Sequence, residues 1–227
     1  MTTRRPLRLL GVLVLVLSVT AALAAGDAAA KKKKKKGPAT TTVDITKVVA
    51  APVPDATAST DGVLTSTIAV AGKQLQNRQI RDVNATISTL GSTPSGMTTA
   101  GSANQLGARL TAPNGATTWL FGPNFVLTGA SILNLTLDDE SPNRLTGGNP
   151  RDPTELGPPY IGNAQPDPFS AFGNVSFSAM DGGPASGTWT LTVWDGIAPA
   201  PPAVPAATSI LSSWRLVMIA GKPFKTK

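Results

Sequence analysis

Carboxylates are the main reactive side chains in this chain, because its 227 residues include 13 Asp and Glu but no His and no Cys. Without imidazole or thiol groups the chain cannot form a Ser-His-Asp triad, a Cys-His pair or a zinc site that needs His ligands. Two carboxylates can hydrolyse a glycosidic bond, but only where a cleft holds them about 5 to 10 Å apart. We therefore predict a protein that is not an enzyme.

Several of these acids cluster at the end of one apolar segment and in loops. They are Asp138, Asp139, Glu140, Asp152, Glu155, Asp167, Asp181 and Asp195. Calcium prefers several oxygen ligands on flexible loops, so one hypothesis is a calcium site formed by Asp138, Asp139 and Asp181. The alternative is that the acids are solvated, cap turns or pair with Arg144 and Arg151, and such surface pairs contribute about 0 to 1 kcal/mol.

Two aromatic residues are candidates for ligand contact. In G-T-W-T-L-T-V-W-D-G, residues 187–196, Trp189 and Trp194 have opposite parity and so lie on opposite faces of one strand. Trp189 shares its parity with apolar residues, whereas Trp194 falls on a threonine face, and Tyr160 lies in G-P-P-Y-I-G. One hypothesis is that Trp194 and Tyr160 stack on a ligand such as a sugar. The alternative is that both rings pack beneath neighbouring loops. For Trp194 the expected loop is residues 199–205.

Short alternating segments must position these residues. β-Branched and apolar residues alternate in T-S-T-I-A-V, I-R-D-V-N-A-T-I-S-T-L, S-I-L-N-L-T-L, N-V-S-F-S-A-M, G-T-W-T-L-T-V-W-D and S-S-W-R-L-V-M-I. Pro113, Asn114 and Gly115 predict a hairpin turn between Leu110 and Trp119, because Asn-Gly readily takes positive φ angles. Seven or eight such strands, without a sustained helical pattern, predict one antiparallel β-sandwich.

The same alternation predicts which side chains fill the interior. The apolar sets are Trp189, Leu191 and Val193 in one strand and Trp214, Leu216 and Met218 in the last one. We expect both indoles to be buried and each indole N–H to find an acceptor. A domain of this size can bury about two-thirds of its unfolded surface, so it needs no disulfide.

The first 60 residues differ in composition from the rest. Residues 1–30 contain Arg4, Arg5 and Arg8, an apolar run and A-x-A sequences, which predicts a secretory signal peptide; the alternative is an uncleaved membrane anchor. The six lysines from Lys31 to Lys36 and a Pro-, Ala- and Thr-rich stretch to residue 60 predict a disordered linker. The lysines form either a solvated tail or an attachment to an anionic surface.

The formal net charge of +7 is misleading, because the signal segment and the lysine run hold nine of the basic residues. Beyond Lys36, 11 basic residues face 12 acidic ones. A nearly neutral folded part lacks the basic footprint that nucleic-acid binding needs. With the signal segment and the absence of cysteine, this predicts a secreted or cell-surface protein that does not bind nucleic acid.

Six motifs follow one another along residues 80–216. They are I-R-D-V-N-A-T-I at 80–87, A-R-L-T-A-P-N-G at 108–115, L-T-L-D-D-E at 135–140, P-D-P-F-S-A-F-G at 166–173, G-T-W-T-L-T-V-W-D at 187–195 and S-S-W-R-L at 212–216. In this order they resemble the P domain, or P/Homo B domain, of subtilisin-like proprotein convertases. The resemblance implies a jelly-roll β-sandwich, similar to galactose-binding-like domains, that supports a separate catalytic domain.

The sequence both matches and departs from that family. Asp139 matches the aspartate of the family's D-D-E motif. Where relatives have a His and an Asp-Leu pair, this chain has Thr89-Leu90 and Asn104-Gln105-Leu106, and a Pro-rich stretch follows Asp195. These differences put inherited contacts at those loops in doubt.

Taken together, the observations predict one folded domain, residues 61–221, behind a signal peptide (1–30) and a linker (31–60). We expect a secreted, non-catalytic module that binds or stabilises an exported subtilisin-like protease supplied by another chain. The alternative is a cell-surface adhesin or carbohydrate-binding module, which the lysine arm retains and which contacts a cell-surface polymer through Trp194 or Tyr160.

Overall fold

The computed structural model shows two β-sheets packed face to face. It describes residues 40–54, 56, 60–92, 106–122, 132–145, 156, 160–166, 176–196 and 209–223. The five-stranded sheet contains, in spatial order, β1 (Thr41–Pro52), β9 (Ser209–Gly221), β3 (Gln79–Ser92), β6 (Ile132–Leu137) and β7 (Tyr160–Ala164). The four-stranded sheet contains β2 (Gly62–Val70), β8 (Gly187–Asp195), β4 (Leu106–Thr111) and β5 (Thr117–Phe121).

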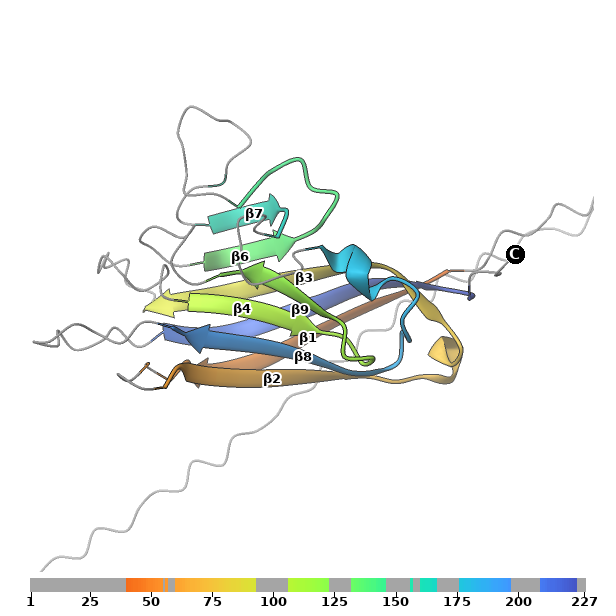
Figure 1. Cartoon of the computed structure of the whole chain (residues 1–227), viewed down its shortest axis with the longest axis horizontal. Coiled ribbons are helices and arrows are strands. Elements are labelled where there is room, and N and C mark those ends of the chain that lie inside the picture. The colour runs from red at the N-terminus through yellow and green to blue at the C-terminus, as the bar shows by residue number, and fades with distance from the viewer. Residues whose placement is uncertain are drawn as a thin grey trace, which may run out of the picture.

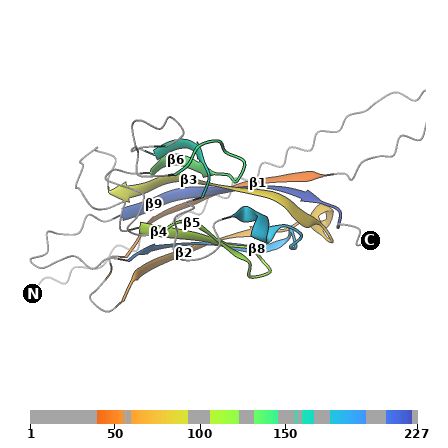
Figure 2. The same ribbon diagram turned by 45° about the horizontal axis from the view of Figure 1, so that its top comes forward.

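The two sheets form separate layers. Figure 1 shows β4, β8 and β2 in front of β9 and β1, and Figure 2 shows the two layers one above the other. The helices of the described residues are two short 3-10 helices, η1 (Lys73–Leu75) and η2 (Phe177–Met180). The predicted all-β sandwich is therefore confirmed.

One strand pair departs from the predicted antiparallel arrangement. Strand β7 runs parallel to β6, with Ile132 opposite Tyr160 and Leu137 opposite Ala164. A parallel pair needs a long connection that returns the chain to the starting end of the sheet. Residues 138–159 provide that length.

The core lies between the sheets and is filled by alternate residues of each strand. On β8 these are Trp189, Leu191 and Val193, and on β9 they are Trp214, Leu216 and Met218, all of them buried. Trp189 and Trp214 are each 0% exposed. The prediction that both indoles point inward is confirmed.

The two buried indoles differ in their hydrogen bonds. Trp214 donates Nε1–H to Oγ of Ser66 on β2 at 2.9 Å, whereas Nε1 of Trp189 has no hydrogen-bond partner. The expectation of an acceptor is thus confirmed for Trp214 and wrong for Trp189. The residue opposite Trp189 on β2 is Ile68, whose side chain offers no acceptor.

The predicted hairpin joins β4 to β5. The N–H of Ala112 donates to the Ala116 carbonyl at 2.8 Å, and the N–H of Ala116 donates to Oδ1 of Asn114 at 3.1 Å. Gly115 has a φ of +86°, whereas Asn114 is not among the residues with positive φ. Asn114 therefore stabilises the turn through its side chain, and Gly115 supplies the left-handed conformation.

The fold begins earlier than predicted, because Thr41–Pro52 forms strand β1 along β9. Val43 is buried opposite Met218, so this segment contributes to the core. The predicted linker to residue 60 and the domain boundary at residue 61 are wrong for these residues. β1 is an edge strand of its sheet. Lys47 and Pro52 are tolerated there because one side of an edge strand's backbone pairs with no other strand.

The segment N-V-S-F-S-A-M does not form the predicted strand. From Ser176 onward it is described, and it forms η2, in which Phe177 and Met180 are buried. Residues three apart share a face of a 3-10 helix, which explains why these two positions face the core. Oγ1 of Thr118 on β5 donates to the Ser176 carbonyl at 2.8 Å and holds η2 against the four-stranded sheet.

Candidate functional site

The outer face of the four-stranded sheet carries two tryptophans. The residues that alternate with the core on its strands point outward. They are Val63, Thr65, Thr67 and Ala69 on β2, Thr188, Thr190, Thr192 and Trp194 on β8, Gly107, Arg109 and Thr111 on β4, and Thr117 and Trp119 on β5. Threonine is the commonest type, and Arg109 is the only ionisable residue in this set. We call this surface the threonine face.

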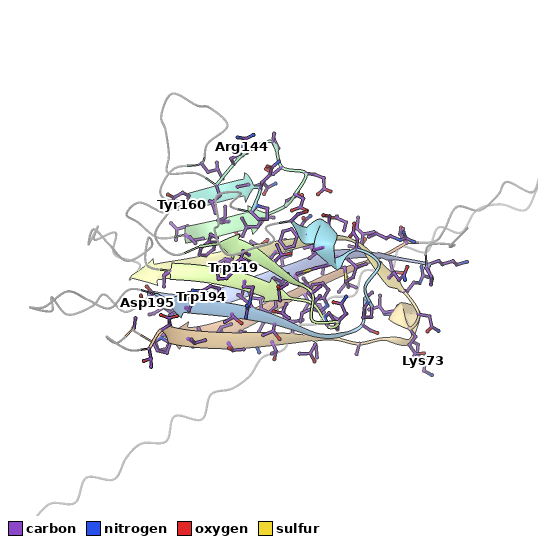
Figure 3. The ribbon with its side chains drawn as sticks, viewed as in Figure 1. Lys73, Trp119, Arg144, Tyr160, Trp194 and Asp195 are labelled. Atoms are coloured by element: carbon purple, nitrogen blue, oxygen red, sulfur yellow. The ribbon has the colours of Figure 1, made fainter. Side chains whose placement is uncertain are left out.

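Arg109, Trp119 and Trp194 contact one another on the threonine face, and we call them the tryptophan–arginine cluster. The two ring centroids are 4.4 Å apart and the ring planes are 81° from parallel, so one ring meets the other edge to face. The guanidinium carbon of Arg109 lies 5.9 Å from each ring centroid. Figure 3 labels Trp119 and Trp194 close together where β4 and β8 run side by side.

Strand register explains why these residues meet. Trp119 on β5 lies opposite Arg109 on β4, and Trp194 on β8 lies opposite Gly107 on β4. Because Gly107 has no side chain, both rings can reach over β4 and touch. Edge-to-face aromatic pairs contribute about 0.5 to 1.5 kcal/mol beyond the area they bury, so the cluster also ties β5 to β8.

Sequence reasoning found one member of the cluster and missed two. Trp194 lies on the threonine face as predicted and is partly exposed. The structure shows Trp119 and Arg109 as its neighbours, while residues 199–205, the predicted packing partner, lie outside the described residues. The hairpin parity could have placed Trp119 beside Arg109, but no local pattern indicates that β4 pairs with β8.

Comparisons with known proteins leave the function to be inferred from this geometry. The chain matches no known family model and no curated protein. The resemblance to the P/Homo B domain therefore depends on the six motifs alone.

Tyr160, the other predicted ligand contact, does not lie on the threonine face. It begins β7 of the five-stranded sheet (Figure 3), and its side chain is 0% exposed. A fully covered ring has no surface on which a ligand can stack. The structure corrects the ligand-contact hypothesis for Tyr160 in favour of packing, because the pairing of β7 with β6 draws it into the core.

A second polar group lies where β3, β6 and η2 meet. It consists of Asp82 on β3, Asp138, Asp139 and Glu140 after β6, and Asp181 after η2. We call these five residues the acidic corner. The three predicted calcium ligands, Asp138, Asp139 and Asp181, are among its members.

Hydrogen bonds within the acidic corner join loops to η2. Oδ2 of Asp139 accepts from Oγ of Ser176 at 2.6 Å and from the N–H of Ser178 at 3.1 Å. Oδ1 of Asp138 accepts from the N–H of Glu140 at 2.9 Å. These bonds resemble the turn-capping role that the alternative to calcium predicts.

Three carboxyls of the acidic corner, those of Asp82, Glu140 and Asp181, have raised pKa values. Burial, followed by the charges of Asp138 and Asp139, raises the pKa of Asp82. Burial, followed by the charges of Asp82 and Asp139, raises the pKa of Asp181. A side-chain hydrogen bond to Asp138, followed by burial and the charge of Asp82, raises the pKa of Glu140 to about 7.

Calcium binding stays a prediction. Among the residues that the structure describes, no three His, Cys, Asp or Glu side chains are grouped so as to hold a metal ion. Asp195 ends β8 and is buried, and Arg144 forms no ion pair within the described parts of the chain. The remaining predicted acids and their partner, Asp152, Glu155, Asp167 and Arg151, lie outside the described residues.

The N-terminal predictions also lie outside the described residues. They are the signal peptide at residues 1–30 and the lysine arm from Lys31 to Lys36. Within residues 40–223, where the structure describes them, there is no helix with the length and hydropathy to cross a bilayer.

Proposed function

We propose that this chain is a secreted, non-catalytic binding module that contacts a cell-surface carbohydrate polymer through the threonine face. The observation that carries the proposal is the tryptophan–arginine cluster, in which two partly exposed indoles and a guanidinium share one sheet face. Trp and Arg are enriched at binding hot spots. The absence of His and Cys supports a role without nucleophilic catalysis.

The threonine face suits a sugar polymer because it combines two kinds of contact. A sugar ring has an apolar C–H face, which can stack on an indole, and hydroxyl groups at its edge. The Thr hydroxyls around the cluster are both donors and acceptors and can pair with those edges. A strand surface is also rigid, so the contacts are held in place before the ligand arrives.

The test is retention of the full chain on purified cell-wall polysaccharide. Truncating a hot-spot tryptophan typically costs about 2 kcal/mol or more, so Trp194→Ala should weaken retention at least about tenfold. Arg215→Ala, on the outer face of the other sheet, should leave retention unchanged. Urea midpoints of both variants exclude unfolding as the cause. Unchanged retention of folded Trp194→Ala would contradict the proposal.

The second candidate is a P/Homo B-like module that supports an exported subtilisin-like protease. It is favoured by the position of the motifs, since residues 80–87 lie in β3, residues 187–195 form β8 and residues 212–216 lie in β9. In addition, β1, β2, β3 and β4 alternate between the two sheets, which supports jelly-roll connectivity. Recovery of a subtilisin-like protease on the immobilised full chain would favour this candidate.

A further inference from the structure

We propose that the ligand of the threonine face is an acidic polysaccharide whose carboxylate binds the guanidinium of Arg109. The inference depends on the proposed function, because it names the ligand class of the same face. It assigns to Arg109 the role of selecting charged over neutral sugars.

The first argument is that Arg109 has no carboxylate partner among the residues that the structure describes. Its Nε is buried without a hydrogen-bond partner, and no carboxylate in the described part of the chain forms an ion pair with it. Arg215, on the outer face of the other sheet, donates Nε–H and Nη2–H to Asp44 at 2.7 and 2.5 Å. Arginine presents its donors in a fork that matches a carboxylate, so Arg109 has the chemistry to receive one from a ligand.

The second argument is that Arg109 is held in place before binding. Its guanidinium carbon lies 5.9 Å from the ring centroids of both Trp119 and Trp194, within the range of cation–π attraction. A side chain that is already ordered loses less conformational freedom when it binds. Because the two ring planes are 81° from parallel, one of the two indoles, and not both, can present its face to the sugar that carries the carboxylate.

The third argument is the pattern of hydroxyl groups next to Arg109. Strand register aligns Thr67, Thr190, Thr111 and Thr117 in one row across β2, β8, β4 and β5. The next row contains Thr65, Thr192, Arg109 and Trp119. Neighbouring strands lie about 4.8 Å apart, so hydroxyls recur at that spacing across the sheet. A chain of sugars offers hydroxyls along its length to match them.

Charge complementarity decides which acidic polymer fits. Arg109 is the only cation among the outward residues of the four strands, and Lys47 reaches only the edge, where it donates Nζ–H to the Thr67 carbonyl at 2.7 Å. Nucleic acid carries a phosphate on every nucleotide and needs several basic contacts. One guanidinium instead suits a polysaccharide in which carboxylates alternate with neutral sugars.

The experiment uses the full chain with a hyaluronan hexasaccharide, in which glucuronate alternates with a neutral sugar, and with the same oligosaccharide after reduction of its carboxyl groups. Calorimetry in about 0.15 M salt, where long-range attraction is screened, measures both affinities. We expect the acidic form to bind at least about tenfold more tightly, because hydrogen bonds to charged groups are the stronger ones.

Variants locate that preference. Arg109→Gln should bind both oligosaccharides equally, and Arg109→Lys should retain part of the preference because it keeps the charge without the fork. Arg215→Gln, which changes the net charge by the same amount, should behave as wild type. The series is repeated with Lys31 to Lys36 replaced by Gln, since a lysine run attracts any polyanion.

The outcomes separate the two proposals. Equal binding of both oligosaccharides by the wild type, or a tenfold preference that survives in folded Arg109→Gln, overturns the role of Arg109 but leaves a sugar-binding face. No binding of either oligosaccharide, combined with no retention on cell-wall polysaccharide, overturns the carbohydrate function as well. Tighter binding of oligothymidylate than of the acidic hexasaccharide would assign the face to nucleic acid instead.

Discussion

Trp214 on β9 donates its indole N–H to Oγ of Ser66 on β2 across the interior of the sandwich, at 2.9 Å. The two residues belong to different sheets and are 148 positions apart in the sequence. Both side chains are buried. This bond therefore links the two layers at a defined point, which apolar packing alone does not do.

Replacing Ser66 by Ala should lower the free energy of unfolding by about 1 to 3 kcal/mol, because the indole N–H of Trp214 would be buried without an acceptor. Urea denaturation of the full chain measures the change. Thr65→Ala is the matched control, because Thr65 precedes Ser66 on β2 and is exposed. This substitution should change the free energy of unfolding by about 0.5 kcal/mol or less. Equal losses in the two variants would contradict the role of the bond.

The two core tryptophans should respond differently to replacement by Phe. Trp214→Phe removes a donor and leaves the hydroxyl of Ser66 without this partner, whereas Trp189→Phe removes an N–H that has no acceptor. Both variants lose a similar ring volume. Trp189→Phe should therefore cost about 1 kcal/mol less than Trp214→Phe in chemical denaturation. The opposite order would show that packing, and not the hydrogen bond, dominates at Trp214.

Local patterns predicted the orientation of single residues well. The parity of Trp189 and Trp194 within β8 gives their faces directly, because side chains alternate along any strand. The neighbours of Trp194 were not predictable in this way. They depend on the pairing of β4 with β8, and more than 70 residues separate these strands in the sequence, so no short-range signal records it.

Two segments were predicted wrongly for opposite reasons: composition outweighed alternation in the first, and apparent alternation suggested a strand in the second. The Pro-, Ala- and Thr-rich start of the fold was read as a linker, although Val43 and Ile45 alternate with polar residues and pack in β1. Phe177 was placed in a strand, although its spacing from Met180 fits a 3-10 turn. The acidic corner was found only in part, because Asp82 reaches it from β3, far from the D-D-E motif.

Two glycines should differ in their tolerance of Ala. Gly115 has a φ of +86° and nothing lies within 4 Å of the position of an added Cβ, so Gly115→Ala should cost about 1 to 2 kcal/mol of backbone strain. Gly187 has a φ of +135°, and an added Cβ would lie 2.6 Å from Cβ of Pro113. Gly187→Ala should cost more, because the clash adds to the strain. Urea midpoints that place Gly115→Ala below Gly187→Ala would contradict this reasoning.

Calcium is expected to bind at the acidic corner and to stabilise the folded chain. Equilibrium dialysis of the full chain at millimolar calcium measures binding directly, and Asp139→Asn should weaken it because one carboxylate charge is lost. Asp44→Asn is the control, since Asp44 lies on β1 and pairs with Arg215. Absence of binding at millimolar calcium would leave the corner with its structural role at Ser176 and Ser178.

The acidic corner should also set the pH dependence of stability. The pKa of Glu140 is about 7 in the folded protein against an ordinary 4.5, so folding takes up a proton between these values, and this residue's effect on stability falls as pH rises through that range. Glu140→Gln should flatten that fall and be more stable than wild type at pH 8, while the raised pKa values of Asp82 and Asp181 keep part of the slope.

The contribution of Asp44 to the pH dependence of stability has the opposite sign, because the hydrogen bond from Arg215 lowers the pKa of Asp44. Asp44→Asn should therefore lose stability above the ordinary Asp pKa of 3.8. Urea midpoints of the wild type, Glu140→Gln and Asp44→Asn between pH 4 and 8 measure how stability changes with pH. If the stability of the wild type and of Glu140→Gln falls equally steeply, Glu140 is not the cause of the fall.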